Sequence, residues 1–536
     1  MTQPVYDVAI VGFGPTGAVA AALLGRRGLR TLVCDRLHEV YDKPRAIALD
    51  HEIMRVFQEL GLEEELAACT EPFTDSLFYG VDGTLIKRMS TVPPPYPMGY
   101  TPSLVFTQPR LEELLRRHVG QLPMVTLALG QTVTGLQQTG EQATLNLQGD
   151  NGQSSTVHAR YVIACDGASS TVRGLAGLPL DDLGFDEPWL VVDVLLKERG
   201  LAKVPALSAQ YCEPQRPCSY IIGPGTHRRW EISINEGEDP QHLATPEGTW
   251  PLLARWITPD DATLWRQASY RFHALVARDW RRGRVFLAGD AAHQQPPFLG
   301  QGMCQGIRDV ANLCWKLDAV LTAGARDALL DSYGPERKAH VTELTRRIKH
   351  IGQLIGERDP AAARERDRAL LAQAGGVVQP TPRQDVQPPI GSPGDTACCL
   401  AGVAHAARGT LFQQPWMLRP EGRKRLDHVT GTGWRLVLAA DAGNEVRASA
   451  RQHASDGALS LVDLADPAWA EADGVLAGWM ARHECRAALV RPDHYVFGVA
   501  DSADEVDALA ADWQLTTVRA EPVEALRQAQ GERCVS

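Results

Sequence analysis

Residues 7–35 read DVAIVGFGPTGAVAAALLGRRGLRTLVCD, and this stretch decides the fold of the first part of the chain. The apolar, β-rich run Asp7–Val11 leads directly into glycines and then into the alanine- and leucine-rich Ala18–Arg27. A second short apolar run, Thr31–Asp35, follows, so the order is strand, tight turn, helix, strand. This order predicts a βαβ unit and hence an α/β sheet with neighbouring parallel strands.

The turn has the spacing GxGxxG, with glycines at Gly12, Gly14 and Gly17. In such a turn the first glycine allows the tight bend, the second lets a pyrophosphate approach the backbone, and the third allows close helix–strand packing. Asp35 ends the next strand, where a carboxylate can bond ribose hydroxyls. The next residue, Arg36, is a further candidate for binding the cofactor. The motif predicts a bound dinucleotide, although a glycine turn without a ligand is the alternative and the motif alone does not separate FAD from NAD.

A second motif, DGASSTVR at residues 166–173, follows the predicted buried strand Tyr161–Cys165. Asp166 begins a tight turn at the end of this strand, and we expect its carboxylate to face a crevice. Ser170 and Arg173 add polar groups suited to a nearby phosphate. An ordinary turn with a solvated arginine is the alternative interpretation of this string.

A third motif, GDAAH at residues 289–293, follows the predicted strand Val285–Ala288. Asp290 is placed to bond the ribityl chain of a flavin. Further on, Pro297 stiffens the chain, and Gly300 and Gly302 let the backbone pass close to a flat ring. The helix expected after Gly302 would direct its positive end toward a reduced, anionic flavin. A Pro/Gly loop that only caps this helix is the alternative.

Bulk composition excludes several classes of protein. The 536 residues are 44% hydrophobic with a net charge of −11, which argues against a non-specific nucleic-acid binder. No apolar run approaches the length of a membrane span, and the N-terminus lacks the features of a signal peptide. The eleven cysteines form no CxxC pair, so no zinc or redox motif is indicated. We therefore expect a cytoplasmic protein without metal, nucleic-acid partner or stable membrane association.

The order of predicted elements divides the chain into domains. Strand-like segments without a dinucleotide signature occupy the middle, and a Pro/Gly-rich stretch precedes a fresh α/β pattern near the end. The expected domains are the first part of a nucleotide-binding domain (1–180), a substrate-binding β-sheet domain (181–275), a return to the first domain with long helices (276–358), a linker (359–399), a small third α/β domain (400–518) and a tail (519–536).

Taken together, the motifs resemble those of class A flavoprotein monooxygenases in the para-hydroxybenzoate hydroxylase and phenol hydroxylase superfamily. Within it, the chain most resembles the 3-(3-hydroxyphenyl)propionate hydroxylases. The resemblance runs along nearly the whole chain and is carried by GFGPTG, KPRAIALD (43–50), QPRLEELL (108–115), CDGASSTVR (165–173), GRVFLAGDAAH (283–293), GQGMCQGIRDVANLCWKL (300–317), ARDALLDSYGPERKAH (325–340) and VRPDHYVFGVA (490–500).

The resemblance implies a Rossmann-like FAD-binding domain, an inserted substrate sheet and a C-terminal thioredoxin-like domain. Arg45 and Gln108 would contact the flavin, and the segment of Asp166 would serve both FAD and NAD(P)H. Because the third domain lacks CxxC, a structural or homodimer-related role is expected for it. NADH or NADPH would reduce the flavin, O₂ would give a flavin 4a-hydroperoxide, and a phenolic aromatic acid would be hydroxylated beside its hydroxyl.

Three residues are candidates for handling the phenol proton: Asp50, His51 and His273. Asp50 and His51 follow the KPRA string, and His273 lies between the substrate sheet and the third motif. Satisfied polar residues near an interface are the alternative interpretation. Where relatives of the phenylpropionate type commonly carry two acidic residues, this chain has Asp50–His51, which bears on the identity of the substrate.

Other functions stay open at this point. The same chemistry could act on a simple phenol, a resorcinol-like diphenol or a polyketide aromatic. A halogenase of related fold is disfavoured because the chain has no WxWxIP-like string. A flavin-binding protein without turnover is the alternative from a different class.

Overall fold

The computed structural model describes residues 5–391, 397–402, 404–455 and 457–517, and the tail expected over 519–536 lies outside this part. Its contacts divide the chain into two units, Met1–Val310 with His340–Pro388, and Ala311–Ala339 with Pro389–Ser536. Helices α9 (Gly302–Leu321) and α10 (Tyr333–Gly356) each contribute residues to both units. Among the described residues, no helix combines the length and apolarity needed to cross a membrane.

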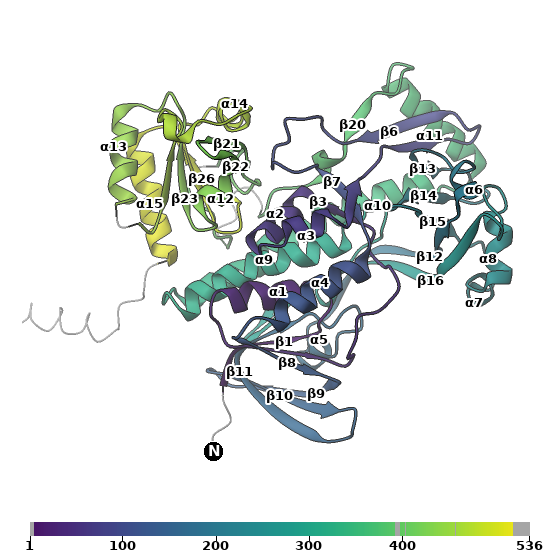
Figure 1. The fold of residues 1–536 in the computed structure, drawn as a ribbon, viewed down its shortest axis with the longest axis horizontal. Helices are drawn as coiled ribbons and strands as arrows, with labels where there is room; N and C mark the ends of the chain where they lie inside the picture. The colour runs from purple at the N-terminus through teal and green to yellow at the C-terminus, as the bar shows by residue number, and fades with distance from the viewer. Residues whose placement is uncertain (1–4, 392–396, 403, 456, 518–536) are drawn as a thin grey trace, which may run out of the picture. The chain divides into compact units, whose positions relative to one another are not determined.

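A mixed sheet in the first unit carries the glycine-rich turn. Its central strand β1 (Val5–Val11) pairs in parallel with β2 (Thr31–Asp35) and β11 (Ser154–Ala164). Helix α1 (Pro15–Arg26) packs beside α4 (Gln108–Gly120) against this sheet (Figure 1). Apolar runs buried on both faces are typical of parallel strands covered by helices. The remaining strands are β8 (Val125–Leu129), β9 (Gln131–Gln138), β10 (Ala143–Gly149), β17 (Arg281–Arg282) and β18 (Val285–Leu287).

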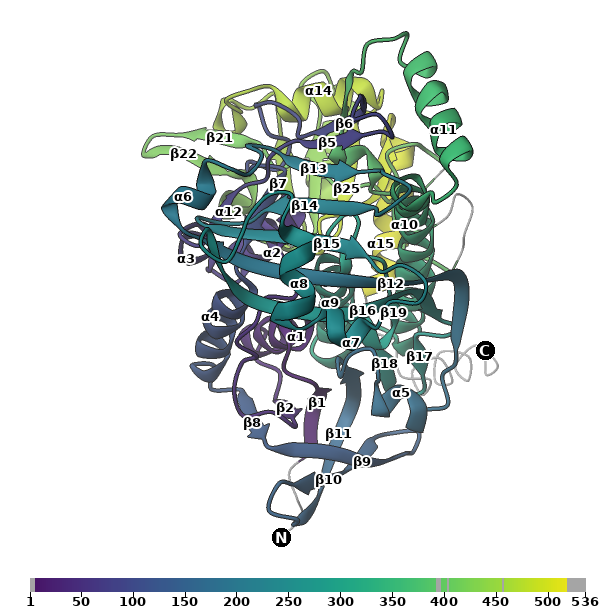
Figure 2. The ribbon, with the colours of Figure 1, turned by 90° about the vertical axis from the view of Figure 1, so that its right-hand side faces the viewer.

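The second sheet of this unit has nine strands, five of which lie within or overlap the predicted substrate domain. Its order is β19 (His293–Gln294), β16 (Ala262–Ala277), β12 (Leu180–Leu196), β15 (His227–Ser233), β14 (Cys218–Ile222), β13 (Ser208–Tyr211), β5 (Ser76–Tyr79), β6 (Leu85–Ser90) and β20 (Pro380–Pro382). Figure 2 shows these strands stacked side by side, with α7 (Pro240–Leu243) and α8 (Pro246–Leu253) in front of them.

The two faces of this sheet differ in character. On one face Leu190, Val192, Trp230 and Ile232 form a buried apolar cluster together with Leu253 of α8. Because side chains alternate along a strand, the residues between these point to the opposite face. That opposite face carries polar residues and forms part of the candidate site.

Smaller elements complete the first unit. Strands β3 (Ala48–Asp50), β7 (Ser103–Phe106) and β4 (Thr70–Pro72) form a short antiparallel sheet. The helices beside these sheets are α2 (His51–Glu59), α3 (Glu63–Ala67), α5 (Thr171–Leu175) and α6 (Glu198–Leu201). Within the segment predicted to be a linker, Pro360–Gln373 forms the helix α11, which the sequence analysis did not predict. Asp359 caps this helix by accepting from two backbone amides, and Pro360 occupies the first turn.

The second unit contains a four-stranded sheet in the order β24 (Ser460–Asp463), β23 (Arg435–Leu438), β25 (Ala487–Val490), β26 (Val496–Ala500). β23 is parallel to β24 and antiparallel to β25, which is the arrangement of a thioredoxin-like sheet. Its helices are α12 (Leu426–Thr430), α13 (Asn444–His453), α14 (Val475–Arg482) and α15 (Ala503–Thr517), and β21 (Trp416–Arg419) pairs with β22 (Gly422–Arg425).

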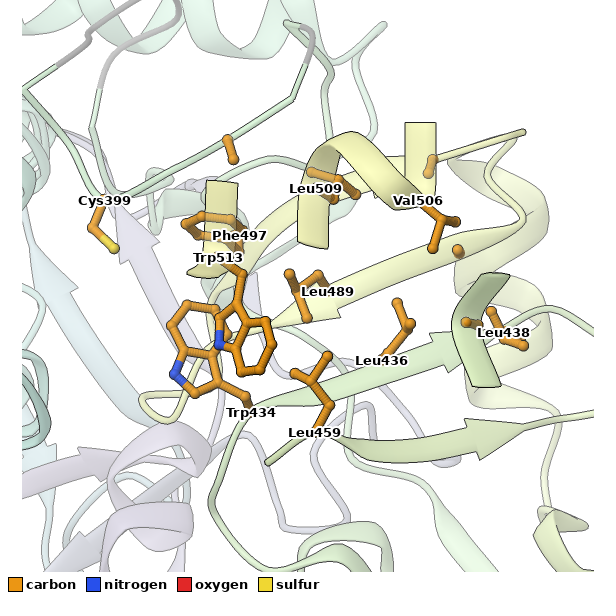
Figure 3. Packing of buried hydrophobic residues seen from close by; sticks show 14 of the residues in the cluster. Cys399, Trp434, Leu436, Leu438, Leu459, Leu489, Phe497, Val506, Leu509 and Trp513 are labelled. Atoms are coloured by element: carbon orange, nitrogen blue, oxygen red, sulfur yellow. The ribbon is translucent and has the colours of Figure 1, made fainter. Parts of the chain in front are cut away.

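One core of this unit is built around aromatic rings. The ring of Trp434 packs edge-on against Phe497 at 5.2 Å and lies 6.4 Å from Trp513. Figure 3 shows these rings beside Leu489 and Leu459. Residues 311–339, which the sequence assigns to the flavin-binding domain, cluster with this unit. Two contacts join these residues to the rest of the unit: Arg491 donates a hydrogen bond of 2.8 Å to Glu336, and the ring of Trp315 packs 5.7 Å from that of Trp434.

Candidate active site

The three sequence motifs converge in the first unit. A Cβ added to Gly12 would lie 2.3 Å from the carbonyl oxygen of Cys165, so the first motif touches the second. Thr16 Oγ1 would lie 2.8 Å from a Cβ on Gly289 and 2.3 Å from one on Gly306, so it also touches the third motif and the helix after it. These glycines are required because neighbouring backbone or side-chain atoms fill the space where a Cβ would be.

The glycine loop leaves room where a cofactor phosphate is expected. A Cβ on Gly14 would meet nothing within 4 Å, in contrast to Gly12 and to Gly17, where it would lie 1.9 Å from a carbonyl oxygen. Gly14 is the N-cap of α1 and no side chain caps this helix. The first backbone amides of α1 are therefore available to an anion. This is the donor set that the pyrophosphate of FAD needs.

Asp35 and Arg36 follow β2 next to this loop. Asp35 Oδ2 accepts a 2.6 Å hydrogen bond from Phe13 N, and Oδ1 accepts one of 2.7 Å from Leu37 N. The carboxylate therefore fixes the glycine loop directly. Arg36 is exposed. Contacts of Asp35 and Arg36 with the cofactor stay predictions.

The second motif is held together by its own side chains. Asp166 accepts from Ser170 Oγ at 2.5 Å and from Val172 N at 3.1 Å. Arg173 donates to the carbonyl oxygen of Ala291 at 3.0 Å, which ties the second motif to the third. Asp166 therefore shapes the turn at the end of β11, and its predicted contact with FAD would add to that role.

Asp290 is exposed, unlike the buried residues on either side of it. The surrounding protein nevertheless raises the pKa of its carboxyl, while the charges of His293 and Arg45 oppose this shift. A carboxyl that is close to protein on several sides and still open to solvent is suited to bonding a ligand's hydroxyl groups.

Gln108 positions the segment that carries Arg45. Its Oε1 accepts from the backbone amides of Arg45 and Ala46, and its Nε2 donates to Glu112 at 2.6 Å. The side chain is buried. Gln108 thus holds the loop in place, and a direct flavin contact stays a prediction.

The loop after GDAAH approaches the KPRAIALD segment. Gly300 has φ +65°, and its amide donates to the carbonyl oxygen of Pro297 at 2.7 Å. A Cβ on Gly300 would lie 3.0 Å from the Cβ of Ala48, whereas one on Gly302 would meet nothing within 4 Å. Gly300 therefore permits a close passage, and Gly302 leaves the start of α9 open, as a flat ring would require.

Asp50 is held in its ionised form. It caps α2 through Oδ1, and its Oδ2 accepts a 2.5 Å hydrogen bond from Arg308, which also bonds Glu52 at 2.5 Å. Burial would raise the pKa of Asp50, but the charge and hydrogen bond of Arg308 hold it below its usual value. A carboxylate bound in this way is a poor proton acceptor.

His51 is buried beside Asp50, and its Nδ1 has no hydrogen-bond partner among the described residues. Burial lowers the pKa of His51 to about 4, Asp50 opposes this shift, and Arg308 and Arg55 reinforce it. His51 is therefore neutral at pH 7. Asp50 and His51 are neighbours in the chain and both are buried, and a role for either in handling the phenol proton stays a prediction.

His273 lies apart from these two residues. It is the register partner of Asp186, and its Nδ1 lies 3.4 Å from the Asp186 carboxylate. Its neighbour Phe272 packs against Trp189 on the polar face of the sheet, so His273 points to the opposite face. The structure does not bring His273 to the candidate site.

One row of side chains on the polar face was missed by the sequence analysis. Gln210, Ser219, Glu231 and Val191 are register partners on four adjacent strands, so their side chains are neighbours. Glu231 is 2% exposed, and its Oε2 has no hydrogen-bond partner among the described residues. The available signal was the alternation in HRRWEIS (227–233), which places polar residues on one face of a buried strand.

Contacts on both sides of this row fix its position. Arg229 adjoins the row on one side and donates to the carbonyl oxygen of Arg45 at 2.7 Å. Trp189 adjoins it on the other side, and its ring packs against Phe298 at 5.3 Å. The segments of Arg45 and Phe298 meet at Gly300. The row therefore faces the place where the cofactor loops come together.

Arg383 was also missed, because it lies in the predicted linker. It is buried, donates to Ser76 Oγ at 2.6 Å and stacks 4.1 Å from the ring centre of Phe73. Among the described side chains it forms no ion pair, and Asp75 is paired with Arg88 instead. Burial lowers the pKa of Arg383 to about 10, and the charge of Asp75 opposes this shift. It is thus a buried cation that no carboxylate among the described side chains neutralises by direct pairing.

Comparisons with known proteins agree with this site. Residues 5–348 match the FAD binding domain family, and residues 409–515 match the HcaD C-terminal domain. A probable NADH-specific resorcinol 4-hydroxylase of Rhodococcus jostii is 37% identical, with 94% of each chain covered. A 3-(3-hydroxy-phenyl)propionate/3-hydroxycinnamic acid hydroxylase of Burkholderia vietnamiensis is 32% identical, with 94% of this chain and 95% of the relative covered.

Solved structures share the fold. The flavin-dependent monooxygenase PieE, solved with FAD and substrate, has a TM-score of 0.78 at 22% identity, covering 96% of this chain and 100% of that one. Aklavinone-11 hydroxylase with FAD and aklavinone has a TM-score of 0.77, also at 22% identity with the same coverage. From the family match, the relatives and the three converging motifs, the chain belongs to the FAD binding domain family and is a flavin-dependent aromatic hydroxylase that uses FAD, a nicotinamide donor and O₂.

Proposed function

We propose that this enzyme hydroxylates a phenolic ring that also carries a carboxylate, in the cytoplasm and with NADH as donor. The single observation that carries the substrate class is Arg383, a buried guanidinium without an ion-pair partner among the described side chains. A buried cation is costly unless an anion compensates it, and an arginine fork fits a carboxylate. The relative from Burkholderia vietnamiensis is named for such phenolic acids.

In this proposal each part of the site has its own task. FAD supplies the oxygen-transferring chemistry when it is bound. Gly14 and the first amides of α1 hold its pyrophosphate, and Asp290 holds its ribityl hydroxyls. Trp189 and Phe298 exclude water from the reacting ring, which protects an oxygen-activating flavin from wasteful reaction with water.

A second candidate substrate is a resorcinol-like diphenol. It is favoured by the Rhodococcus jostii relative, which has the higher identity of the two and is named for resorcinol. A diphenol has no carboxylate, so it would offer no anion to pair with Arg383. The two candidates therefore differ in their dependence on this one residue.

A substrate panel on the FAD-loaded enzyme tests the proposal. NADH consumption is measured with 3-(3-hydroxyphenyl)propionate, 3-hydroxycinnamate, resorcinol and phenol, and each product is identified by mass. We expect the acids to give the highest kcat/KM. We expect Arg383→Met to lower kcat/KM about 100-fold for the acids only, because the variant loses a charge-assisted hydrogen-bonded pair that contributes about 3 kcal/mol. Resorcinol as the best substrate, with the acids indifferent to Arg383→Met, would overturn the substrate class. Failure of every phenol to stimulate NADH consumption would overturn the function.

A further inference from the structure

We infer that Glu231 takes the proton of the substrate's phenolic hydroxyl, and is therefore a catalytic residue of this hydroxylase. The inference rests on the proposed function, since it requires a phenol to be bound between the polar face of the substrate sheet and the cofactor loops. It assigns a role that the sequence motifs left open.

Geometry is the first support. Glu231 is 2% exposed and lies in the polar row, between Arg229 and Ser233, which is the register partner of Trp189. Its Oε2 is buried and has no hydrogen-bond partner among the described residues. An unsatisfied buried oxygen costs about 1–3 kcal/mol, so such an atom is rare unless another group comes to bond it.

The neighbouring charges provide the second support. Arg229 Nη1 lies 3.9 Å from Glu231 Oε1, and the same guanidinium is mainly bonded to Asp193, at 2.8 and 3.1 Å. Glu231 is thus only weakly paired. Burial raises the pKa of Glu231 to about 7, Arg229 opposes this shift and Asp193 adds to it. A general base works best when its pKa is close to the operating pH.

The other acid–base candidates are less suited. Asp50 is bound to Arg308 and caps α2, so its oxygens are already used. His51 has a pKa near 4, which makes it a weak base at neutral pH. His273 points to the other face of the sheet. Glu231 combines an unused oxygen with the correct face.

The spacing between Glu231 and Arg383 fits one small substrate. Ser76, which Arg383 bonds, lies on β5, and Glu231 lies on β15, three strand spacings away. Three spacings are about 14 Å between the backbones of Ser76 and Glu231, and the strand registers place both side chains on the same face of the sheet. A phenol with a carboxylate on a short chain can span a distance of this order, with its carboxylate at the guanidinium bonded to Ser76 and its hydroxyl at Glu231.

The proton transfer is balanced as follows. The O–H bond of the phenol breaks, the proton passes to Glu231 Oε2, and the electron pair stays on the phenolate oxygen. The ring becomes electron-rich, which favours attack on an electrophilic oxygen. After hydroxylation the substituted ring carbon loses its hydrogen as a proton, which restores the O–H of the phenol oxygen. The proton on Glu231 leaves with the second oxygen atom of O₂, which becomes water, so Glu231 regains its charge and is not consumed.

The test compares Glu231→Gln with the parent enzyme, both loaded with FAD. With 3-(3-hydroxyphenyl)propionate, or resorcinol if the panel favours it, we expect kcat/KM of the parent to rise with pH up to about 7 and then level off. We expect Glu231→Gln to lower kcat/KM about 100- to 1,000-fold, the range typical of a lost general base, and to abolish this limb. Glu238→Gln is the matched control, because Glu238 pairs with Arg216 outside the site.

A purely structural role would give a different result. If Glu231→Gln retains the acid limb with its midpoint near 7, or keeps the parent's rate, the inference is wrong. If Glu231→Gln does not bind FAD, Glu231→Asp carries the test, because it should keep the acid limb at a reduced rate, and loss of the limb there counts against the inference. Failure of the proposed function would look different, because the parent enzyme itself would then be inactive with every phenol.

Discussion

His293 Nε2 lies 2.7 Å from Asp309 Oδ2, and both side chains are buried. The same oxygen accepts a 2.9 Å hydrogen bond from Gly289 N, so Asp309 holds both ends of the GDAAH motif. His293 is therefore a structural member of the motif. A residue on α9 thus fixes the loop that presents Asp290.

Removing this support should loosen the cofactor loop. Asp309→Ala leaves Gly289 N and the His293 ring without their buried acceptor, which we expect to cost about 1–3 kcal/mol of stability. The purified variant should have a lower melting temperature and a lower flavin-to-protein absorbance ratio. Unchanged values of both would contradict the role of Asp309.

Alanine substitutions at two of the three glycines of the first motif, Gly14 and Gly17, should have different effects. Gly17→Ala places a Cβ 1.9 Å from a carbonyl oxygen, so we expect the folded protein to be lost. Gly14→Ala has open space in the protein itself, so the variant should fold with nearly normal stability and lose FAD. Flavin content and thermal unfolding, measured together, separate the two effects. Gly120→Ala, which also has no neighbour within 4 Å, is the control and should retain the flavin.

Asp290 should matter for the cofactor and not for the fold. Because the protein around Asp290 raises the pKa of this carboxyl, its ionised form is disfavoured, and Asp290→Ala should leave the stability of the apoprotein unchanged or slightly higher at pH 7. The same change should weaken FAD retention, seen as loss of yellow colour during purification. Full flavin occupancy in this variant would refute the assigned role.

The lowered pKa of His51 predicts how the stability of the protein changes with pH. Its pKa is about 6.5 unfolded and about 4 folded, so between these values the unfolded chain binds more protons. Its contribution to stability is therefore fully present above pH 6.5 and is lost as the pH falls toward 4, by up to about 1.4 kcal/mol per pH unit. Denaturant unfolding of His51→Gln should show a shallower loss over this range. An identical slope in the variant would contradict the shifted pKa.

The adjacent cysteines of the second unit should be dispensable for catalysis. Cys398 and Cys399 are buried and form no disulfide, and burial raises the pKa of Cys399 to about 11. A thiol of this kind is mostly protonated and unreactive. We expect Cys398→Ser and Cys399→Ser to leave turnover unchanged in the NADH assay. A large loss would restore a redox role for this unit, whose dimer-related role stays a prediction.

Sequence reasoning predicted the parts of the fold whose signals are local. The βαβ unit around Gly12 and the strands before Asp166 and Asp290 were predicted because apolar runs, glycines and aspartates lie next to each other in the chain. Helix α11 was missed even though Asp359 and Pro360 form a helix start, because the proline-rich residues after it dominated the interpretation.

The site was only partly predictable for a different reason. The positions of Glu231 and Arg383 in the site depend on strand register and burial, and Arg383 bonds Ser76, which is 307 residues away in the chain. Likewise, β5 and β6 join the substrate sheet because Ser76 pairs with Ser208. No pattern within residues 76–90 predicts that pairing. Long-range contacts of this kind have no signature in a single sequence.

The outermost pairing of the substrate sheet has a consequence for protein synthesis. Strand β6 obtains its outer neighbour only from Pro380–Pro382, some 290 residues later. A nascent chain on the ribosome therefore presents an unpaired β-edge until most of it has been translated. Truncation anywhere between β6 and β20 should leave that edge open to other chains, and we expect such fragments to need chaperones or to aggregate.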